Sequence, residues 1–395
     1  MLWPRDLSDL VATDRRDVLS IYLDVDPTKP ENQSAHPAYV IWLRNALRDI
    51  LNGLSKEDRR TLGATAQELE NFVASTRPAG RGLVLFAAPG LWRQHFLPVP
   101  VSNHAAYGRP NTMPLLWTID EYEPYAILFI DSEHARILAA YLGRTAVVEE
   151  EALELDTSDW RFKAGRPPTF TKAAGTGASR GAQRDTFEAR VEDHVRRFWQ
   201  SAADATAKWL DELQIGRLII GGPETATSAV REMLPEHAHD SVVGLVPLPA
   251  YSDVSEIRER TLPVALAAER RREDELVAQL LDLAGAHSGG VVGKAATLNA
   301  LQQGQAMMLV ADRELTGTVW QCVECNYVSV DATDRCAVCG GAVEEFELPQ
   351  LLPLLAYRSG AAIELVGKDA AERLRAHEGL GALLRYVQAP AAEPA

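Results

Sequence analysis

The sequence has no long apolar run. No stretch approaches the roughly 20 apolar residues that a membrane-spanning helix requires, so we expect no membrane segment. The first residues, Met1 to Asp6, also lack the charged region and following apolar region of a secretory signal. These two absences predict a soluble protein of the cytoplasm.

Basic residues are outnumbered by acidic residues. The 40 Lys and Arg residues stand against 55 Asp and Glu, which gives a net charge of −15. This balance argues against a protein that coats nucleic acid or an anionic membrane over its whole surface, although it permits a local basic patch. The length of 395 residues, 46% of them hydrophobic, is enough for about two to four globular domains.

Cysteine is scarce and confined to one place. Four cysteines fall within 18 residues in the pattern C-x2-C-x10-C-x2-C: Cys322, Cys325, Cys336 and Cys339. Four thiolates at this spacing suit one tetrahedral metal ion and leave no open coordination position, which is typical of structural zinc, with iron as a competitor in vitro. Two disulfides are the alternative, and a cytoplasmic location disfavours them. We therefore predict a structural zinc ribbon over residues 318–347.

Hydrophobic patterning predicts an α/β protein of three domains, with boundaries at 1–121, 122–250 and 251–395. We expect a mixed sheet with flanking helices in the middle domain, and an α/β/α sandwich that carries the zinc ribbon in the third. Buried strands are predicted at 18–25, 82–88, 126–130, 135–141, 217–220, 306–310 and 361–366. Helices are predicted at 37–52, 187–209, 225–234 and 262–283.

Two segments are rich in charge. The run Glu-Arg-Arg-Arg-Glu-Asp-Glu at 269–275 is interpreted as the solvated face of a helix. Residues 158–184 contain six Lys or Arg and one acid, and therefore carry a charge of +5. This second segment is also rich in Gly, Pro and small residues, so it cannot bury a core and is predicted to be an exposed, mobile loop.

The sequence at 180–190, Arg-Gly-Ala-Gln-Arg-Asp-Thr-Phe-Glu-Ala-Arg, resembles the middle domain of archaeal and eukaryotic peptide-chain release factors. In that family a Gly-Gly-Gln motif follows an Arg and precedes a helix with Phe, Arg and His, as Phe187, Arg190 and His194 do here. Four further stretches resemble the family in the same order along the chain: 82–86, 125–138, 217–223 and 293–310. The resemblance is to the bacterial branch, with its ribosome-rescue candidates, its Pelota-like members and the hibernation factor Balon.

This resemblance implies a ribosome-binding translation factor that occupies the A site and presents the tripeptide Gly181, Ala182 and Gln183 to peptidyl-tRNA. Gln183 would position the water that attacks the ester between the nascent chain and the tRNA. The basic residues of the loop would contact ribosomal RNA: Lys163, Arg166, Lys172, Arg180 and Arg184. A monomer is expected, and a translational GTPase as delivery partner is left open.

Two departures from the family motif matter. Stop-codon reading in the family uses Asn-Ile-Lys-Ser, and the helix at 37–52 has no such sequence, which implies a stop-codon-independent role. Ala182 stands where the family has its second glycine. A left-handed conformation costs Ala about 1–2 kcal/mol, which corresponds to a roughly 5- to 30-fold slower reaction. Peptidyl-tRNA hydrolysis and a non-catalytic hibernation role in the A site therefore both stay open, as does an RNA-binding adaptor role away from the ribosome.

Overall fold

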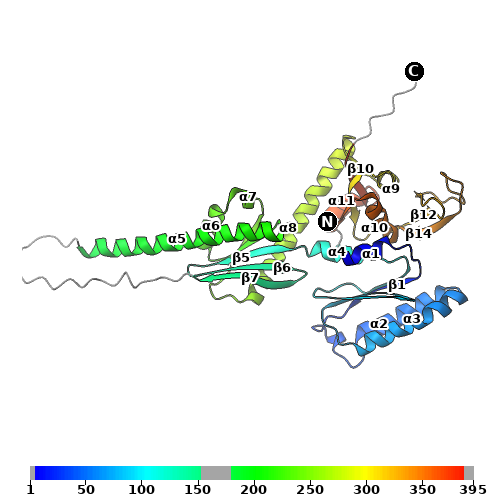
Figure 1. The fold of residues 1–395 in the computed structure, drawn as a ribbon, viewed down its shortest axis with the longest axis horizontal. Helices are drawn as coiled ribbons and strands as arrows, with labels where there is room; N and C mark the ends of the chain where they lie inside the picture. Colours follow the sequence, from blue (N-terminus) through cyan, green and yellow to red (C-terminus); the bar gives the residue numbers. More distant parts are fainter. Residues whose placement is uncertain (1–4, 153–178, 387–395) are drawn as a thin grey trace, which may run out of the picture. The chain divides into compact units, whose positions relative to one another are not determined.

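The computed structural model describes residues 5–152 and 179–386 (Figure 1), with side chains from residue 7 onward and without those of 179–190. The chain divides into two compact units. Unit 1 combines residues 1–123 with 269–395, and unit 2 spans residues 124–268. The three boundaries proposed from the sequence stay a prediction. No helix among the described residues has the length and apolar character needed to cross a membrane.

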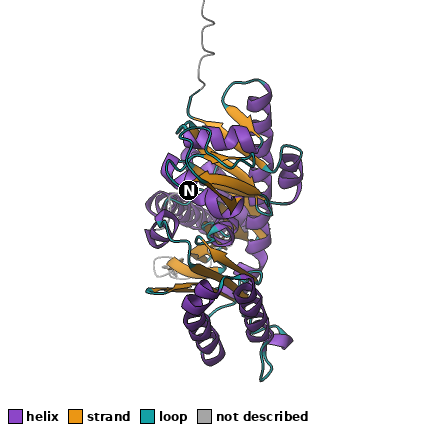
Figure 2. Ribbon diagram, turned by 90° about the vertical axis from the view of Figure 1, so that its right-hand side faces the viewer, coloured by secondary structure: helices purple, strands orange, loops and turns teal. Residues whose placement is uncertain are grey.

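The N-terminal part of unit 1 is an antiparallel sheet covered by two helices. The strands are β1 (Val18–Asp24), β2 (Gly82–Ala88), β3 (Leu91–Leu97) and β4 (His104–Gly108), in the order β3-β2-β1-β4. Helices α2 (Ala38–Gly53) and α3 (Lys56–Ser75) lie side by side and bury Leu43, Leu47 and Leu69 against the sheet (Figure 2). Shorter helices complete this part: α1 (Arg5–Ala12), the 3-10 turn Pro30–Asn32 and α4 (Met113–Glu121).

The C-terminal part of unit 1 is built on a second sheet, in the order β10-β16-β11-β15. Its strands are β10 (Gly290–Val292), β11 (Ala306–Asp312), β15 (Ala362–Val366) and β16 (Leu380–Leu384). Only the β11–β15 pair is parallel. Four helices surround the sheet: the end of α8 (Val254–Gly285), α9 (Lys294–Gln302), α10 (Leu348–Ser359) and α11 (Lys368–Arg375). The predicted α/β class is confirmed.

The ribbon lies between β11 and β15 in the chain, as the sequence predicts. It is a small antiparallel sheet in the order β13-β12-β14. Its strands are β12 (Thr318–Cys322), β13 (Val328–Ser329) and β14 (Val343–Glu347).

Unit 2 contains the predicted mixed sheet, in the order β7-β6-β5-β8-β9. Its strands are β5 (Tyr125–Ile130), β6 (His134–Tyr141), β7 (Arg144–Ala152), β8 (Leu218–Gly222) and β9 (Val242–Pro247). Strands β5, β6 and β7 pair antiparallel, whereas β5, β8 and β9 pair parallel. Helices α5 (Ser179–Leu213), α6 (Glu224–Met233) and α7 (Glu236–His239) share one core with Leu128 and Ile220, and the first half of α8 covers the opposite face.

Gly222 ends β8 where the chain turns into α6. Its φ is 145°, and a Cβ at this position would lie 2.0 Å from the carbonyl oxygen of Ile130. Only glycine allows the two backbones to approach this closely. Gly222 therefore lets the end of β8 pass close to the end of β5.

Candidate functional site

The tripeptide Gly181–Gln183 lies in helix α5, which begins at Ser179. This corrects the expectation that the tripeptide belongs to the loop ahead of the helix. Lys163, Arg166 and Lys172 lie outside the described residues.

Arg180 and Arg184, the other two predicted RNA contacts, lie on the first turns of the same helix. The structure thus brings these arginines and the tripeptide onto one short segment.

Helix α5 is anchored only along its C-terminal part. Its buried side chains begin at Phe198, and those of Ala203 and Thr206 are fully covered. The indole Nε1 of Trp199 donates to the carbonyl oxygen of Asp131, 2.7 Å away at the end of β5. Residues 191–197 are partly or fully exposed, so the N-terminal part of α5 extends beyond the sheet (Figure 1).

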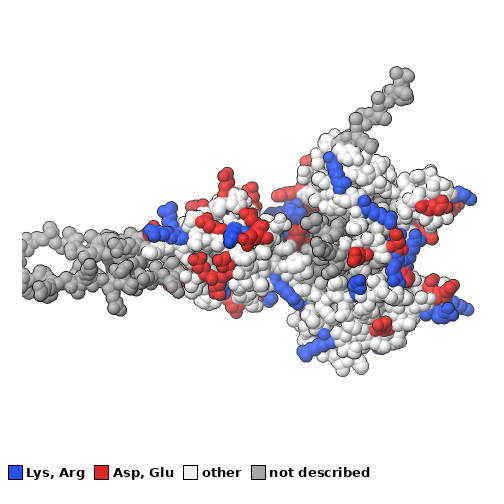
Figure 3. Space-filling view, viewed as in Figure 1, with Lys and Arg blue, Asp and Glu red and all other residues white. Residues whose placement is uncertain are grey.

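The described surface of unit 2 is mainly acidic on the face shown in Figure 3, where Asp and Glu side chains gather over the unit that carries α5. Three exposed glutamates follow one another in β7, Glu149 to Glu151. Such a surface repels RNA phosphates. RNA contact by this unit would therefore depend on the basic residues of 158–184.

The four cysteines form a second candidate site. All are free thiols, and their sulfur atoms lie within 4.8 Å of one another. Cys322 and Cys339 sulfurs are 3.4 Å apart, and those of Cys325 and Cys336 are 3.5 Å apart. Tetrahedral zinc with Zn–S bonds of about 2.3 Å requires sulfur separations near 3.8 Å. The donor set and its spacing therefore fit a four-coordinate metal ion, and these separations are far too long for disulfides.

The ribbon presents its thiols on two matching turns. In the first, the N–H groups of Glu324 and Cys325 point at the sulfur of Cys322, at 3.4 and 3.5 Å. In the second, the N–H of Val338 points at the sulfur of Cys336, at 3.4 Å. Such N–H donors stabilise thiolate over thiol, because the hydrogen bonds favour the charged form.

Each turn closes with a residue in the left-handed region. These residues are Asn326, with a φ of 61°, and Gly340, with a φ of 75°. Asn and Gly are the residues that adopt this conformation most readily. The local sequence therefore supplies the residue types that both turns need.

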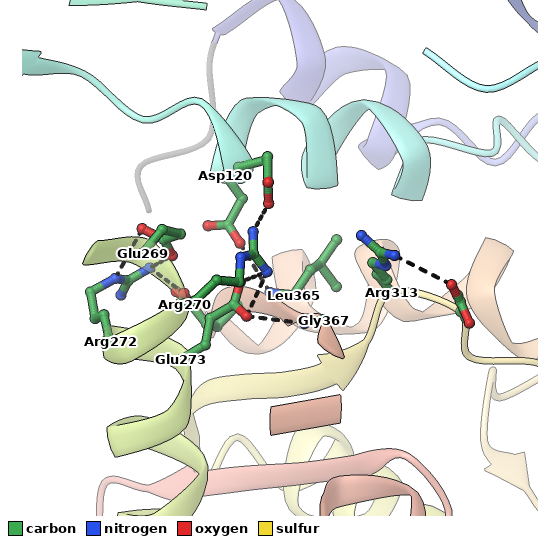
Figure 4. A network of polar contacts seen from close by, with 11 residues as sticks. Asp120, Glu269, Arg270, Arg272, Glu273, Arg313, Leu365 and Gly367 are labelled. Carbon is green, nitrogen blue, oxygen red and sulfur yellow. Dashed lines mark hydrogen bonds and ion pairs between the residues drawn. The ribbon is translucent and has the colours of Figure 1, made fainter. Parts of the chain in front are cut away.

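The charge run at 269–275 is not a solvated face throughout. Arg271 and Glu275 are exposed, as interpreted, but the interpretation was wrong for the other two glutamates. Glu269 and Glu273 are both buried, and they join Asp120 of α4 and Glu364 of β15 in one network (Figure 4). Carboxylate oxygens of Asp120, Glu269 and Glu364, which we call the carboxylate cluster, lie within 4.8 Å of one another. The sequence did contain an indication of this burial. Glu269, Glu273 and Val277 are spaced by four residues and therefore share one helix face, and Val277 is buried.

Arginines and backbone N–H groups hold the carboxylates in place. Arg272 donates to Glu269 over 2.8 Å and also contacts Glu364. Beside them, Arg270 donates to both oxygens of Glu273 over 2.7 Å and pairs with Glu121.

Two backbone bonds tie the network to β15 and the residue after it. Oδ2 of Asp120 accepts from the N–H of Leu365 over 3.3 Å, and Glu273 accepts from the N–H of Gly367 over 3.1 Å. The other oxygen of Asp120, Oδ1, has no hydrogen-bond partner among the described residues.

Burial without enough positive charge raises the pKa of these acids. Desolvation is the largest cause for Glu364 and for Glu273, and it raises each pKa to about 7. The pKa of Asp120 is raised well above its ordinary value, first by burial and then by the nearby Glu364 and Glu269 carboxylates. The network therefore binds protons at neutral pH.

Comparisons with known proteins agree with the resemblance noted in the sequence. Residues 110–266 match the family described as bacterial archaeo-eukaryotic release factor family 10. No curated protein matches the sequence.

Solved structures of similar chains include three translation factors. Archaeal translation termination factor aRF1 is 17% identical, with 97% of this chain and 96% of that chain covered and a TM-score of 0.27. Dom34 of S. cerevisiae, a translation termination-like factor that interacts with Hbs1, is 10% identical, with 78% and 81% covered and a TM-score of 0.41. Archaeal Pelota, bound to the ribosome with ABCE1, is 11% identical, with 97% and 94% covered and a TM-score of 0.43. These TM-scores are too low to indicate a shared function.

Proposed function

We propose that the protein is a ribosome-binding translation factor of the cytoplasm, because its residues 110–266 match the bacterial archaeo-eukaryotic release factor family. It occupies the A site, contacts ribosomal RNA and directs the N-terminal end of α5 toward the peptidyl-transferase centre. There Gly181–Gln183 promotes stop-codon-independent hydrolysis of peptidyl-tRNA, a release or rescue reaction. The observation that carries this proposal is that the family match includes both the tripeptide and the sheet that anchors α5.

The anchoring of α5 supports this role. Its buried part, from Phe198 onward, fixes the direction of the helix, while the part that carries the tripeptide extends away from the core. A rigid support with a projecting tip can reach a recessed RNA site that the acidic body of unit 2 cannot approach. Arg180 and Arg184 then pair with phosphates on either side of the tripeptide.

Two observations favour a non-catalytic second function, the occupation of the A site in a hibernating ribosome. Ala182 replaces the flexible glycine of the family motif. In a helix that begins at Ser179, only the first four N–H groups lack an acceptor within the helix, and Gln183 is the fifth residue. The Gln183 N–H can stabilise a developing oxyanion only after the first turn unwinds.

A peptide-release assay separates the two functions. Ribosomes that hold peptidyl-tRNA and an empty A site are incubated with wild type, Gln183→Ala and Ala182→Gly. In the catalytic case wild type releases peptide, Gln183→Ala is slower, and Ala182→Gly is roughly 5- to 30-fold faster, because glycine adopts the left-handed conformation of an unwound loop without the cost that Ala pays. Binding without release above the ribosome-only control would contradict catalysis and favour the hibernation role.

Ribosome binding itself is tested by co-sedimentation at increasing salt. Alanine replaces the five predicted RNA contacts together: Lys163, Arg166, Lys172, Arg180 and Arg184. This variant should pellet less, and the slope of log affinity against log salt should fall by roughly 0.7–0.9 for each contact removed. The matched control neutralises two exposed arginines of α2, Arg44 and Arg48. Equal pelleting of all three proteins at every salt concentration would exclude the basic segment as the RNA contact.

Zinc is the metal we propose for Cys322, Cys325, Cys336 and Cys339. When bound, it would cross-link the two turns of the ribbon and supply no open position for catalysis. We further propose that the protein acts as a monomer, and that a translational GTPase is a candidate delivery partner.

A further inference from the structure

Unit 1 contains a cavity of about 600 Å³ to which no sequence motif points. One wall is the start of α4, with Met113 and Trp117. The opposite side is the segment from Arg313 to Thr318, which connects β11 to β12. Residues 101–104 and the first turn of α10 close the remaining sides. The volume lies within the roughly 300–1,000 Å³ of small-molecule sites.

The cavity offers a flat aromatic surface. Trp117 is half-buried, and the guanidinium carbon of Arg313 lies 5.1 Å from the centre of its ring. The apolar side chains of Met113 and Leu315 flank this pair. An indole ring that already accepts one cation–π contact and has apolar neighbours suits a planar, unsaturated ligand.

Two polar atoms of the wall lack partners among the described residues: Nε1 of Trp117, a donor, and Oδ1 of Asn111, an acceptor. Asn111 is only 6% exposed, and its other groups are engaged. Its N–H donates to Ser20 Oγ over 2.9 Å, and its carbonyl accepts from the Tyr22 hydroxyl over 2.6 Å. Both residues line the cavity, so a ligand that donates to one atom and accepts from the other would satisfy them.

His104 fixes the orientation of the Asn111 amide. The amide nitrogen lies 2.9 Å from Nε2 of His104, and it can only donate there. Burial lowers the pKa of His104, while the carboxylate of Glu347 acts in the opposite direction. The neutral imidazole accepts the bond, so Oδ1 of Asn111 is the amide atom left for a ligand.

The charges around the cavity disfavour an anion. Glu347 and Glu314 lie on its lining against Arg313. Arg313 lies 3.5 Å from the carboxylate of Glu314. Among the described residues, the carboxylate of Glu347 accepts from the neutral amide of Gln350 over 3.2 Å. The ammonium of Lys294 also lies beside the lining, where it donates to the carbonyl oxygen of Thr316 over 3.1 Å. Two carboxylates and two cations therefore leave no net positive charge to hold a phosphate.

We propose that this cavity binds an uncharged nucleobase, carried either by a free nucleoside or by an unstacked base of single-stranded RNA. The base stacks on Trp117 and offers a donor to Asn111 and an acceptor to the indole N–H. Nucleobases combine a flat ring with both kinds of hydrogen-bonding edge. The cavity lies in unit 1 and does not include Gly181–Gln183, so nucleoside binding does not rest on the proposed ribosomal role. Only the identification of RNA as the molecule that carries the base rests on that role.

The test is calorimetric titration of the full chain, without ribosomes, with the four ribonucleosides, their 5′-monophosphates and a short single-stranded RNA. At least one nucleoside should bind with a stoichiometry of one at concentrations up to about 10 mM, more tightly than its monophosphate. Tighter binding of the RNA than of any nucleoside would identify RNA as the source. No saturable binding of any of these probes would overturn the proposal and leave ordered water as the partner of the two atoms.

Variants assign the binding to this cavity. Trp117→Ala should weaken it by roughly 5- to 150-fold, the range expected for a lost base–aromatic stack. Trp117→Phe keeps a ring, which protects the fold, and Asn111→Ala removes the acceptor; each should cost about five-fold. Glu347→Gln should bring the affinity for the monophosphate closer to that for the nucleoside.

The control Tyr251→Ala removes an 87% exposed aromatic residue of unit 2. Equal affinity in Trp117→Ala and the control would contradict the assignment, and so would a monophosphate that binds wild type more tightly than its nucleoside.

Discussion

The thiols of the ribbon and the carboxylate cluster are both groups of metal-ligand side chains whose donor atoms lie within 4.8 Å of one another. They differ in origin. The thiols come from one stretch of 18 residues, whereas the carboxylates come from α4, α8 and β15, at positions 120, 269 and 364. They also differ in the groups that already contact the potential ligand atoms.

Among the thiols, the described partners are backbone N–H groups that favour thiolate. Among the carboxylates, the guanidinium of Arg272 already bridges Glu269 and Glu364. A divalent cation at the carboxylate cluster would be repelled by that guanidinium. We conclude that close spacing alone does not define a metal site, because the charges already in place decide whether a cation can enter.

The largest expected effect concerns the thiols. Cys336→Ser should lower the metal content from about one zinc per chain to less than about a tenth, because three thiolates hold zinc much more weakly than four. The ribbon should also become sensitive to proteolysis. Metal analysis of protein purified without chelator measures the first effect, and Val338→Ala, an exposed neighbour in the same turn, is the control. If wild-type protein purified without chelator contains no metal and is as stable as Cys336→Ser, the four thiols do not bind a structural metal. The two clusters would then not differ in metal binding.

The second effect concerns the carboxylate cluster. Arg272→Met leaves Glu269 and Glu364 buried without their cation. Breaking a fully buried pair costs roughly 3–5 kcal/mol, and since the Arg272 side chain is 40% exposed we expect about 2–3 kcal/mol. Denaturant unfolding measures the loss. The exposed neighbour Arg271→Met should change stability by less than about 0.5 kcal/mol. If both variants are equally stable, Arg272 does not hold the cluster together.

The third effect is a dependence of stability on pH. The pKa of Glu364 is about 7 in the folded protein, against an ordinary value of 4.5. Between these pH values the unfolded chain loses a proton that the folded chain keeps. Stability is therefore fully present below pH 4.5 and falls as pH rises through 7, by on the order of 3 kcal/mol for this group. Glu364→Gln should flatten the dependence and stabilise the protein at pH 8. An unchanged pH profile in Glu364→Gln would show that Glu364 is not the group responsible for this dependence.

The smallest effect tests whether the ribbon turns are determined locally. Gly340 has a φ of 75° and open space around the position of a Cβ, so Gly340→Ala should cost only the strain of a left-handed Ala, about 1–2 kcal/mol. Asn326→Gly, at the matching position of the other turn, should be close to neutral. Thermal unfolding of the zinc-bound protein compares the two. A larger loss in Asn326→Gly than in Gly340→Ala would show that the turns depend on tertiary contacts.

Several features followed from the sequence because they are local. The ribbon, with its two C-x2-C turns, is encoded within one segment. Strand β2 was predicted with the bounds it has, since a continuous apolar run closed by Pro-Gly leaves little choice. The mixed sheet of unit 2 was anticipated from its hairpin and its Gly-Gly-Pro turn. Helix α8 was predicted too short by about eight residues at its start, because Pro263 lies inside it without ending it.

The sequence by itself determined the four-thiol site, the α/β class and the release-factor motif, since each depends on residue types at short spacings. Only the tertiary structure decided the fate of the charged run at 269–275. Its glutamates are buried because α4 and β15, distant in the sequence, bring Asp120 and Glu364 against them. The cavity beside Trp117 has the same origin, since its walls come from four separate segments. Periodicity along one helix records which residues share a face, and only the packing of the other elements determines what that face meets.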